Sequence, residues 1–306
     1  MTLTELRYIV AVARERHFGR AAEACFVSQP TLSVSIKKLE EELDVKIFER
    51  GANEVTVTPL GGELVRQAQQ VLEQAAAIKE IAKRGKDPLS GPLRLGVIYT
   101  IGPYLLPDLV RQAIERVPQM PLMLQENFTA KLLEMLRTGE LDCAIMAEPF
   151  PDAGLAIAPL YDEPFLAAVP VAHPLAKRKS ITAEELKQET MLLLGTGHCF
   201  RDHVLEVCPE YARFSSDADG IRKTFEGSSL ETIKYMVASG MGVTVVPRLS
   251  VPAELQPHVR YVPFARPAPT RRVVLAWRRT FTRYEAIAAL RNAIYACPLK
   301  GVRRLS

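Results

Sequence analysis

The chain has no long apolar run and few cysteines, and each shortage excludes a class of protein. No stretch of its 306 residues approaches the roughly 18 consecutive apolar residues that a membrane-spanning helix needs. The N-terminal stretch mixes both charge signs, unlike a secretory signal peptide, so we expect a cytoplasmic chain with no membrane partner. Thiols stay reduced in that compartment, so the five cysteines do not indicate a structural disulfide framework.

Signatures of bound cofactors and metal ions are also missing. The Gly-Thr-Gly turn at 195–197 is too short for a dinucleotide fingerprint. The spacing of Cys199 and Cys208 is longer than the spacings that zinc sites favour. We therefore expect no cofactor and no metal ion.

Positive charge is not concentrated at the N-terminus. Residues 1–58 carry 8 Lys and Arg against 9 Asp and Glu, whereas residues 266–306 carry 10 against 1. Bulk charge thus gives no support to nucleic-acid binding by the N-terminal segment, which must be argued from pattern.

The N-terminal segment has the pattern of three short helices and a hairpin. Apolar residues recur at helical spacing from Leu3 to Ala13, and a second helix fits Gly19 to Cys25. Ser28 is a good cap for a third helix, with Pro30 in its first turn. The other face of that helix offers polar groups suited to a DNA groove, namely Gln29, Thr31, Ser33, Ser35 and Lys37. A two-stranded wing follows, formed by Lys46–Arg50 and Glu54–Thr58 around a turn at Gly51, Ala52 and Asn53.

A small three-helix bundle with a polar face would share part of this pattern. The combination, however, resembles the winged helix-turn-helix of LysR-type transcriptional regulators. The residues that carry the resemblance are Phe18, Ala21, Ala22, Ser28, Gln29, Pro30, Leu32, Ser33, Ile36, Leu39, Glu40, Leu43, Phe48, Arg50, Thr58, Pro59 and Gly61. The resemblance implies a DNA-binding domain over 1–58, with a recognition helix that begins near Ser28. The DNA contacts that we expect are Ser28, Gln29, Pro30, Thr31, Ser33, Lys37 and Arg50.

Residues 59–87 are expected to form a long linker helix. Thr58 can cap it, and apolar residues from Leu64 to Ala82 alternate at spacings of four and three, a seam of about three heptads. Such a seam either packs on the next domain or forms a dimer, and the preceding motif favours the dimer. The segment 86–92, Lys-Asp-Pro-Leu-Ser-Gly-Pro, is expected to be a hinge.

Residues 88–306 alternate strand and helix patterns, which indicates parallel α/β sheets. We expect two hinged lobes like those of a periplasmic binding protein, lobe I over about 92–162 and 268–300 and lobe II over about 163–267. This architecture matches the regulatory domain of the same family. Ligands in such folds bind between the lobes, at the carboxyl ends of strands.

Two cysteines in this domain carry the most specific chemical signal. Cys199 follows a predicted strand at 191–194 and opens a helix, with His198, Arg201 and Asp202 beside it. Positive charge and a helix N-terminus lower a thiol pKa. Cys208 lies nine residues on, about 13 Å away along a continuous helix, so a disulfide between them would require local unfolding. The pair is therefore either a redox switch or two inert small side chains.

Wider motifs favour the switch. Gly197–Asp202, followed by Cys208 and Pro209, resembles peroxide-sensing members of the LysR-type family, as do the segments 99–107, 126–129, 137–142, 159–165 and 228–247. The resemblance implies that Cys199 is peroxidatic and Cys208 resolving. It also implies a peroxide site formed by Thr100, Thr129, His198, Asp202 and Arg272. On the plainer interpretation, the two threonines are helix caps and Arg272 is a solvated charge. Of the other cysteines, Cys25 and Cys143 are expected in cores, and Cys297 near the surface.

Three functions compete. The first is a transcription factor that senses hydrogen peroxide through a reversible Cys199–Cys208 disulfide and controls antioxidant genes. The second is a LysR-type regulator with a small organic effector in the cleft. The third is a thiol peroxidase or disulfide oxidoreductase, against which the N-terminal motif argues, so we expect no enzyme. The family resemblance implies promoter DNA and RNA polymerase as partners and a tetramer built from two dimer types.

Overall fold

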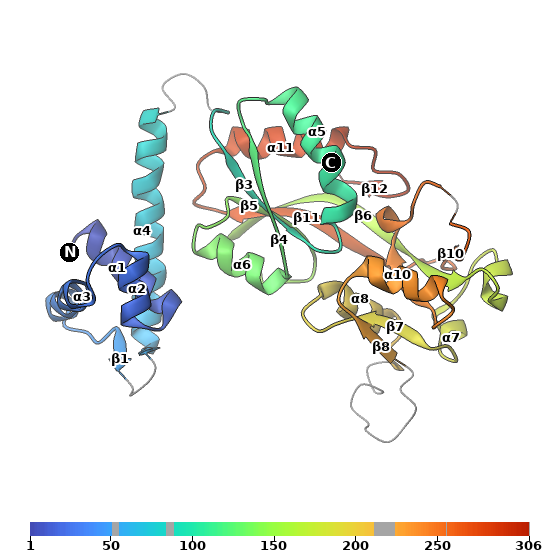
Figure 1. The fold of residues 1–306 in the computed structure, drawn as a ribbon. Helices are drawn as coiled ribbons and strands as arrows, with labels where there is room; N and C mark the ends of the chain where they lie inside the picture. The colour runs from blue at the N-terminus through green and yellow to red at the C-terminus, as the bar shows by residue number, and fades with distance from the viewer. Residues whose placement is uncertain (51–54, 84–88, 211–223, 255, 306) are drawn as a thin grey trace. The chain divides into compact units, whose positions relative to one another are not determined.

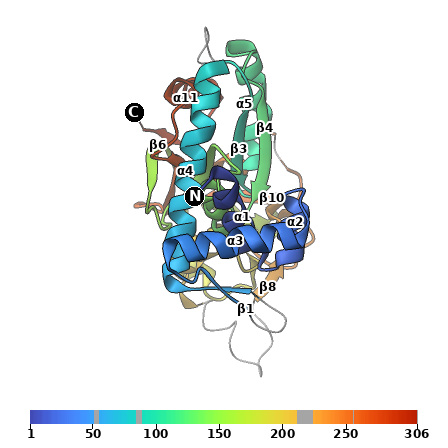
Figure 2. The same cartoon turned by 90° about the vertical axis from the view of Figure 1, so that its left-hand side faces the viewer.

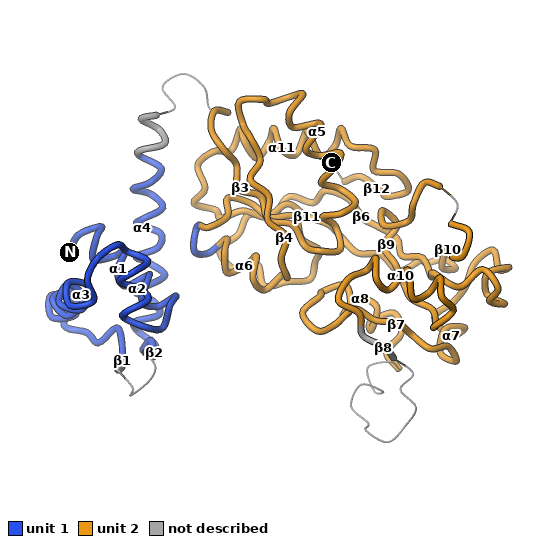
Figure 3. Tube along the Cα trace, viewed as in Figure 1, with its two compact units in different colours: residues 1–87, 137–139 blue, residues 88–136, 140–306 orange. Residues whose placement is uncertain are grey.

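The computed structural model describes residues 1–50, 55–83, 89–210, 224–254 and 256–305 (Figure 1). The chain forms two compact units (Figure 3). One comprises residues 1–87 with 137–139, and the other comprises residues 88–136 and 140–306.

The first unit begins with the three expected helices, α1 (Leu3–Glu15), α2 (Phe18–Ala24) and α3 (Gln29–Leu43). Each has the cap that holds its first turn. Thr2 and Glu5 form a capping box on α1, and the Ser28 hydroxyl accepts from the Thr31 N–H at the start of α3. The α2 cap is His17, whose side chain accepts from the backbone N–H groups of Gly19 and Arg20. Their apolar faces share one core, which includes Leu6, Ile9, Val12, Ala21, Leu32, Ile36 and Leu39.

The wing follows as the antiparallel pair β1 (Phe48–Arg50) and β2 (Val55–Val57). Its expected turn at 51–53 and the side chain of Arg50 lie outside the described residues. The buried carboxylate of Glu40 accepts from the backbone N–H groups of Ile47 (2.8 Å) and Phe48 (3.1 Å). The third helix therefore fixes the chain where it enters the wing.

The linker helix α4 (Pro59–Lys83) packs against α1 (Figure 2). Thr58 caps it as expected, because its hydroxyl accepts from the Gly61 N–H at 2.9 Å. A Cβ on Gly61 would lie 2.3 Å from the Ile47 carbonyl oxygen, so only glycine permits this close approach. Ala68 of the predicted seam is buried in the core of the same unit, whereas Ile78 is 68% exposed. Most of the expected hinge, residues 84–88, lies outside the described residues.

Lobe I of the second unit is built on three parallel strands, β3 (Leu93–Ile98), β4 (Leu122–Asn127) and β5 (Cys143–Ala147). The helices of this lobe are α5 (Gly102–Arg116), α6 (Thr129–Arg137) and α11 (Tyr284–Ala296). Their apolar faces and the sheet form one large core.

Two antiparallel strands join the lobes, so the expectation of purely parallel sheets is wrong. Strand β6 (Leu155–Pro170) pairs through residues 155–164 with β11 (Thr270–Arg278) and through residues 165–170 with β9 (Thr244–Pro247) and β10 (Val259–Pro263). Strand β11 returns to lobe I beside β5, as expected for the segment near Val273. The full order is β10-β6-β11-β5-β3-β4, with β9 and the short β12 (Arg303–Arg304) also on β6.

Lobe II has its own core around the parallel pair β7 (Met191–Leu194) and β8 (Thr224–Gly227). Its helices are α7 (Ala183–Leu186), α8 (Cys199–Val207) and α10 (Leu230–Ala238), with short 3-10 turns at Pro174–Lys177 and Arg248–Ser250. The two cores are separate, which leaves the face between the lobes for polar chemistry.

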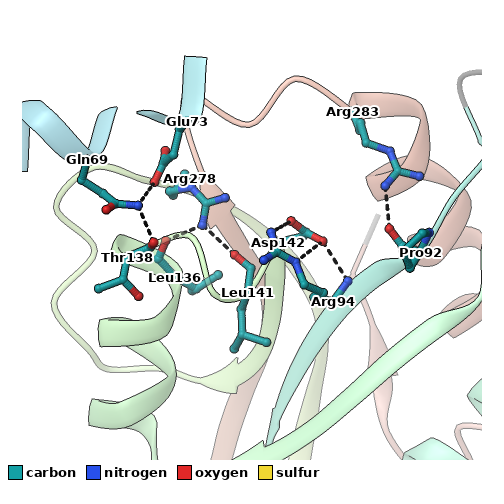
Figure 4. A network of polar contacts seen from close by, with 10 residues as sticks. All are labelled: Gln69, Glu73, Pro92, Arg94, Leu136, Thr138, Leu141, Asp142, Arg278 and Arg283. Carbon is teal, nitrogen blue, oxygen red and sulfur yellow. Dashed lines mark hydrogen bonds and ion pairs between the residues drawn. The ribbon is translucent and has the colours of Figure 1, made fainter. Parts of the chain in front are cut away.

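Three arginines tie the segments of lobe I together (Figure 4). Arg278 donates to the backbone carbonyls of Leu136 and Leu141, which fixes the turn between α6 and β5. Arg94 forms an ion pair with Asp142, and Arg283 donates to the carbonyl of Pro92 at 2.7 Å.

Among the described residues, no helix has the length and apolar character needed to cross a membrane.

Candidate thiol site and nucleic-acid interface

The thiol of Cys199 lies at the end of β7, on the first residue of α8. The turn before it contains Gly197, whose φ of +97° is a conformation that favours glycine. A Cβ on Gly197 would lie 3.3 Å from the ring of Phe128. The turn is thus held tightly against lobe I, and this fixes where α8 begins.

A small cavity lies beside the thiol. Its volume is about 10 Å³ (the space open to the centre of a water molecule), so it is close to the size of one solvent molecule. Thr100, Thr129 and His198 line it together with Cys199, as expected. The remaining lining residues are Ile98, Tyr99, Asn127, Phe128 and Gly197. Asp202 is exposed on α8 and does not line the cavity.

The arginine beside the thiol site is Arg271 and not Arg272, the residue that we expected there. Arg272 is exposed and pairs with Asp162, whereas Arg271 is buried and donates to the Thr100 hydroxyl at 2.8 Å. Side chains alternate across a strand, so a shift of one residue moves a side chain to the other face. In β11, Arg271 stands opposite Glu163 of β6 on the inner face. Arg271 therefore takes the place beside the thiol site that we expected for Arg272.

Arg271 belongs to a buried polar network. Its Nη2 lies 2.7 Å from Oε2 of Glu163, and neither side chain is exposed by more than 1%. Glu163 also accepts from the backbone N–H of Leu249 at 2.7 Å. Because Arg271 donates to the oxygen of Thr100, the proton of the Thr100 hydroxyl remains to be donated to another group.

The expectation of a lowered thiol pKa is also wrong for this conformation. Burial raises the pKa of Cys199 above its ordinary value, while the Thr129 hydroxyl and the charge of Arg271 act against this rise. The nearby Arg201 donates to the backbone carbonyl of Leu194 at 3.0 Å. The thiol therefore rests mainly protonated at neutral pH, with two groups in place that favour its anion.

Two hydroxyl groups and a histidine complete the surroundings of the sulfur. The Thr129 hydroxyl is buried beside the sulfur, where it favours the Cys199 thiolate. His198 stacks edge-on against Phe128 with ring centroids 4.8 Å apart. Burial lowers the pKa of His198, so its ring is neutral at neutral pH. The site can therefore offer hydroxyl donors to a small polar molecule beside the sulfur.

The two cysteines of the predicted pair belong to different cores. Cys199 packs against the core of lobe I, whereas Cys208 ends α8 with its side chain inside the core of lobe II. Burial raises the pKa of Cys208 to about 12. Both are free thiols in this structure.

The other cysteines take no part in the site. Cys143 is buried in β5 and Cys25 is half-buried at the end of α2, in agreement with the core positions that we expected. Cys297 is 1% exposed, so the prediction of a surface position is wrong. It follows α11 directly and packs in the core of lobe I.

A larger cavity of about 390 Å³ adjoins the thiol site between the lobes. It shares Tyr99, Thr100, Phe128 and His198 with the small cavity, and its far side is formed by the start of α10. Its size is within the range of small-molecule sites. It connects the thiol site to the cleft where the two-lobed fold was expected to bind ligands.

The recognition helix α3 exposes most of the polar residues expected to contact DNA. Gln29, Pro30, Thr31 and Lys37 are exposed, and Ser33 is half-buried. Ser28 is occupied as the helix cap, and its hydroxyl also bonds that of Thr31 at 2.8 Å.

Sequence reasoning missed two apolar residues on the same unit. Phe26 is 95% exposed in the turn before α3, with a φ of +57°, and Val34 is 67% exposed on α3. No periodic signal indicates a turn residue such as Phe26. Val34, however, occupies a position of α3 that does not belong to the buried stripe of Leu32 and Ile36.

Comparison with known proteins decides the family. Residues 3–62 match the model described as the bacterial regulatory helix-turn-helix protein of the lysR family, and residues 86–296 match the LysR substrate binding domain. The chain is 41% identical over 292 residues to the DNA-binding transcriptional dual regulator OxyR of Escherichia coli K12, covering 94% of each protein. It is 41% identical over 279 residues to a hydrogen peroxide-inducible genes activator of Dickeya chrysanthemi, covering 91% of this chain and 90% of the relative.

Solved structures agree. A full-length OxyR variant of Pseudomonas aeruginosa superposes with a TM-score of 0.77 at 52% identity, covering 97% of this chain and 98% of that one. A hydrogen peroxide-bound OxyR mutant of Corynebacterium glutamicum gives a TM-score of 0.63 at 34% identity, covering 96% and 91%. The chain belongs to the OxyR group of the LysR family. The chain is therefore a DNA-binding transcriptional regulator rather than an enzyme.

Proposed function

We propose that this regulator senses hydrogen peroxide through Cys199 and Cys208 and changes its contacts with promoter DNA when the two form a disulfide. The observation that carries the proposal is the placement of a free thiol in a solvent-sized cavity beside two hydroxyl groups and a buried arginine. The related proteins, described as activators of hydrogen peroxide-inducible genes, support the same signal.

The first step is attack of the Cys199 thiolate on one oxygen of hydrogen peroxide. The S–O bond forms as the O–O bond breaks, and the leaving hydroxide takes a proton to become water, which leaves a sulfenic acid on Cys199. Thr100 and Thr129 can donate to the peroxide oxygens, and Arg271 holds Thr100 and favours the anionic sulfur. His198 is neutral, so it orients the substrate rather than supplying charge.

The second step is attack of the Cys208 thiolate on the sulfur of Cys199. The S–S bond forms, and the sulfenic hydroxyl leaves and is protonated to water. Because Cys208 lies in the core of lobe II and Cys199 packs on lobe I, α8 must unwind before the two sulfurs meet. Oxidation therefore changes how the two lobes pack against each other. We infer that this change alters how the protein binds DNA.

The assembly and the cellular setting extend this proposal. Two DNA-binding units on one pseudo-palindromic site require at least a dimer, for which the exposed side of α4, including Ile78, offers apolar surface. We propose a dimer of dimers that contacts RNA polymerase at promoters and works in the cytoplasm, where DNA is present and thiols are kept reduced.

The proposal is tested by selecting duplexes from a random pool with the reduced and the peroxide-treated protein, followed by footprinting of the selected sites. We expect peroxide to alter the protected region for the wild type and to leave it unchanged for Cys199→Ser. A Cys297→Ser variant serves as the matched control and should respond like the wild type. A footprint that ignores peroxide but shifts with a metabolite pool would instead support the organic effector in the 390 Å³ cavity.

A further inference from the structure

Helix α8 is held by both lobes through different faces. Phe200, Val204 and Cys208 recur at intervals of four residues, and all three are buried in the core of lobe II. Cys199 and His203 form a second row on the same helix, also four residues apart, and Cys199 packs against lobe I. His203 therefore lies one turn beyond the reactive thiol on the row that begins at lobe I.

His203 forms a direct polar link to lobe I. Its Nε2 lies 2.8 Å from the backbone carbonyl oxygen of Glu148, which follows β5. A carbonyl oxygen only accepts, so Nε2 must carry the proton and donate it. The side chain is 5% exposed, and its Nδ1 has no partner in the described part of the chain.

The surroundings keep this ring neutral and in place. The rings of Phe165 and Phe200 lie within 6.3 Å of the His203 ring, and burial lowers the pKa of His203. A neutral ring has one N–H, and that N–H is committed to Glu148. In the part of the chain that the structure describes, this hydrogen bond joins the Cys199 and His203 row of α8 to the backbone of lobe I.

We propose that His203 is a positioning residue of the switch, whose hydrogen bond to the Glu148 carbonyl holds α8 helical and thereby sets how fast and how completely the Cys199–Cys208 disulfide closes. The proposal rests on the proposed function. The bond exists while α8 is docked and is lost when α8 unwinds, so it stabilises the dithiol and the sulfenic acid relative to the disulfide. Its removal should favour closure without changing the first reaction with peroxide.

The test compares two substitutions of similar volume that differ in hydrogen bonding. In His203→Gln, the side-chain amide nitrogen can occupy the place of Nε2 and donate to Glu148. In His203→Met, no donor remains. If the Met variant does not fold, His203→Asn replaces it, because its shorter amide does not reach the carbonyl. Glu206→Gln, at an exposed position of the same helix, is the control.

Closure is followed by rapid-quench peptide mapping in the full chain, and sulfenic acid formation is followed separately in a Cys208→Ser background. We expect His203→Met to close about five-fold faster than the wild type, the size of effect that one net hydrogen bond gives. The same five-fold change in equilibrium corresponds to a midpoint potential about 20 mV more negative, at about 30 mV per ten-fold change. His203→Gln and Glu206→Gln should stay within about two-fold of the wild type in both steps.

Equal closure rates in the wild type and His203→Met would overturn the proposal. So would a Gln variant that behaves like the Met variant, because the ring would then act by packing alone. These outcomes are distinct from failure of the proposed function, in which the wild type itself would form no Cys199–Cys208 disulfide.

Discussion

Replacing Arg271 should affect the protein far more than replacing its neighbour Arg272. The two residues lie side by side in β11 and differ in the face on which they lie. Arg271→Met leaves the carboxylate of Glu163 buried without its ionic partner, and the pair is at most 1% exposed. Breaking a buried pair in this way costs about 3–5 kcal/mol.

The matched change, Arg272→Met, removes a side chain that is 44% exposed. Its partner Asp162 keeps a second ion pair with Arg303, and solvent-exposed ion pairs contribute little to stability, so the loss should be small. For a domain of this size, 1 kcal/mol shifts Tm by about 2–4 °C. We therefore expect Tm of the reduced protein to fall by about 6–20 °C for Arg271→Met and by much less for Arg272→Met.

Calorimetry of the reduced protein measures the stability effect, and trapping of sulfenic acid at a temperature where both variants are folded measures the chemical effect. Arg271→Met should slow oxidation of Cys199 about ten-fold, because Thr100 loses a charge-assisted hydrogen bond. Arg272→Met should react like the wild type. Equal losses of Tm, or a larger kinetic defect in Arg272→Met, would refute the assignment of Arg271 to the site.

Three further predictions concern the pH dependence of Cys199 oxidation, the turn at Gly197 and the contacts with DNA. Because burial raises the pKa of Cys199, the rate of sulfenic acid formation should rise about ten-fold per pH unit through the neutral range. A rate that is already constant below pH 7 would contradict this, since the thiolate would then form more easily than the structure implies. Gly197→Ala should lower stability by about 1–3 kcal/mol and slow oxidation, since φ is +97° and the Phe128 ring is in contact; thermal unfolding with wild-type stability would contradict this. Gln29→Ala should relax sequence preference, whereas Arg50→Ala should weaken binding to all duplexes and reduce the salt slope, and gel shifts over a salt series on selected and random duplexes separate the two effects.

The helices were predictable because their signals are local. Ser28, Pro30 and the spacing of Leu32 and Ile36 lie within two turns of each other, and together they predict where α3 begins and which face is buried. The position of Cys199 at the start of α8 was predictable for the same reason, since a short apolar strand and a glycine turn precede it.

The predictions that were wrong concern residues whose positions depend on partners distant in the sequence. Both faces of β11 are largely apolar after Arg272, so alternation does not indicate which arginine lies on the inner face. That choice is made by the register in which Arg271 stands opposite Glu163, a residue 108 positions away. The first half of β6 is central in the sheet and lacks the alternation of a half-buried strand, so no local pattern indicates it.

The direction of the Cys199 pKa shift also could not be predicted from the neighbouring residues in the sequence. Sequence neighbours such as Arg201 and His198 predicted a lowered value, but Arg201 bonds the carbonyl of Leu194 and His198 is neutral. Burial between the lobes, which no local pattern reports, dominates the shift.

Peptide mapping of the reduced protein after one equivalent of hydrogen peroxide shows whether Cys199 and Cys208 form the redox pair. We expect a single new cross-linked species that joins the peptides of Cys199 and Cys208, formed through a Cys199 sulfenic acid that accumulates in Cys208→Ser. Oxidation of Cys199 to sulfinic acid without a cross-link, or pairing of either residue with Cys25, Cys143 or Cys297, would contradict it.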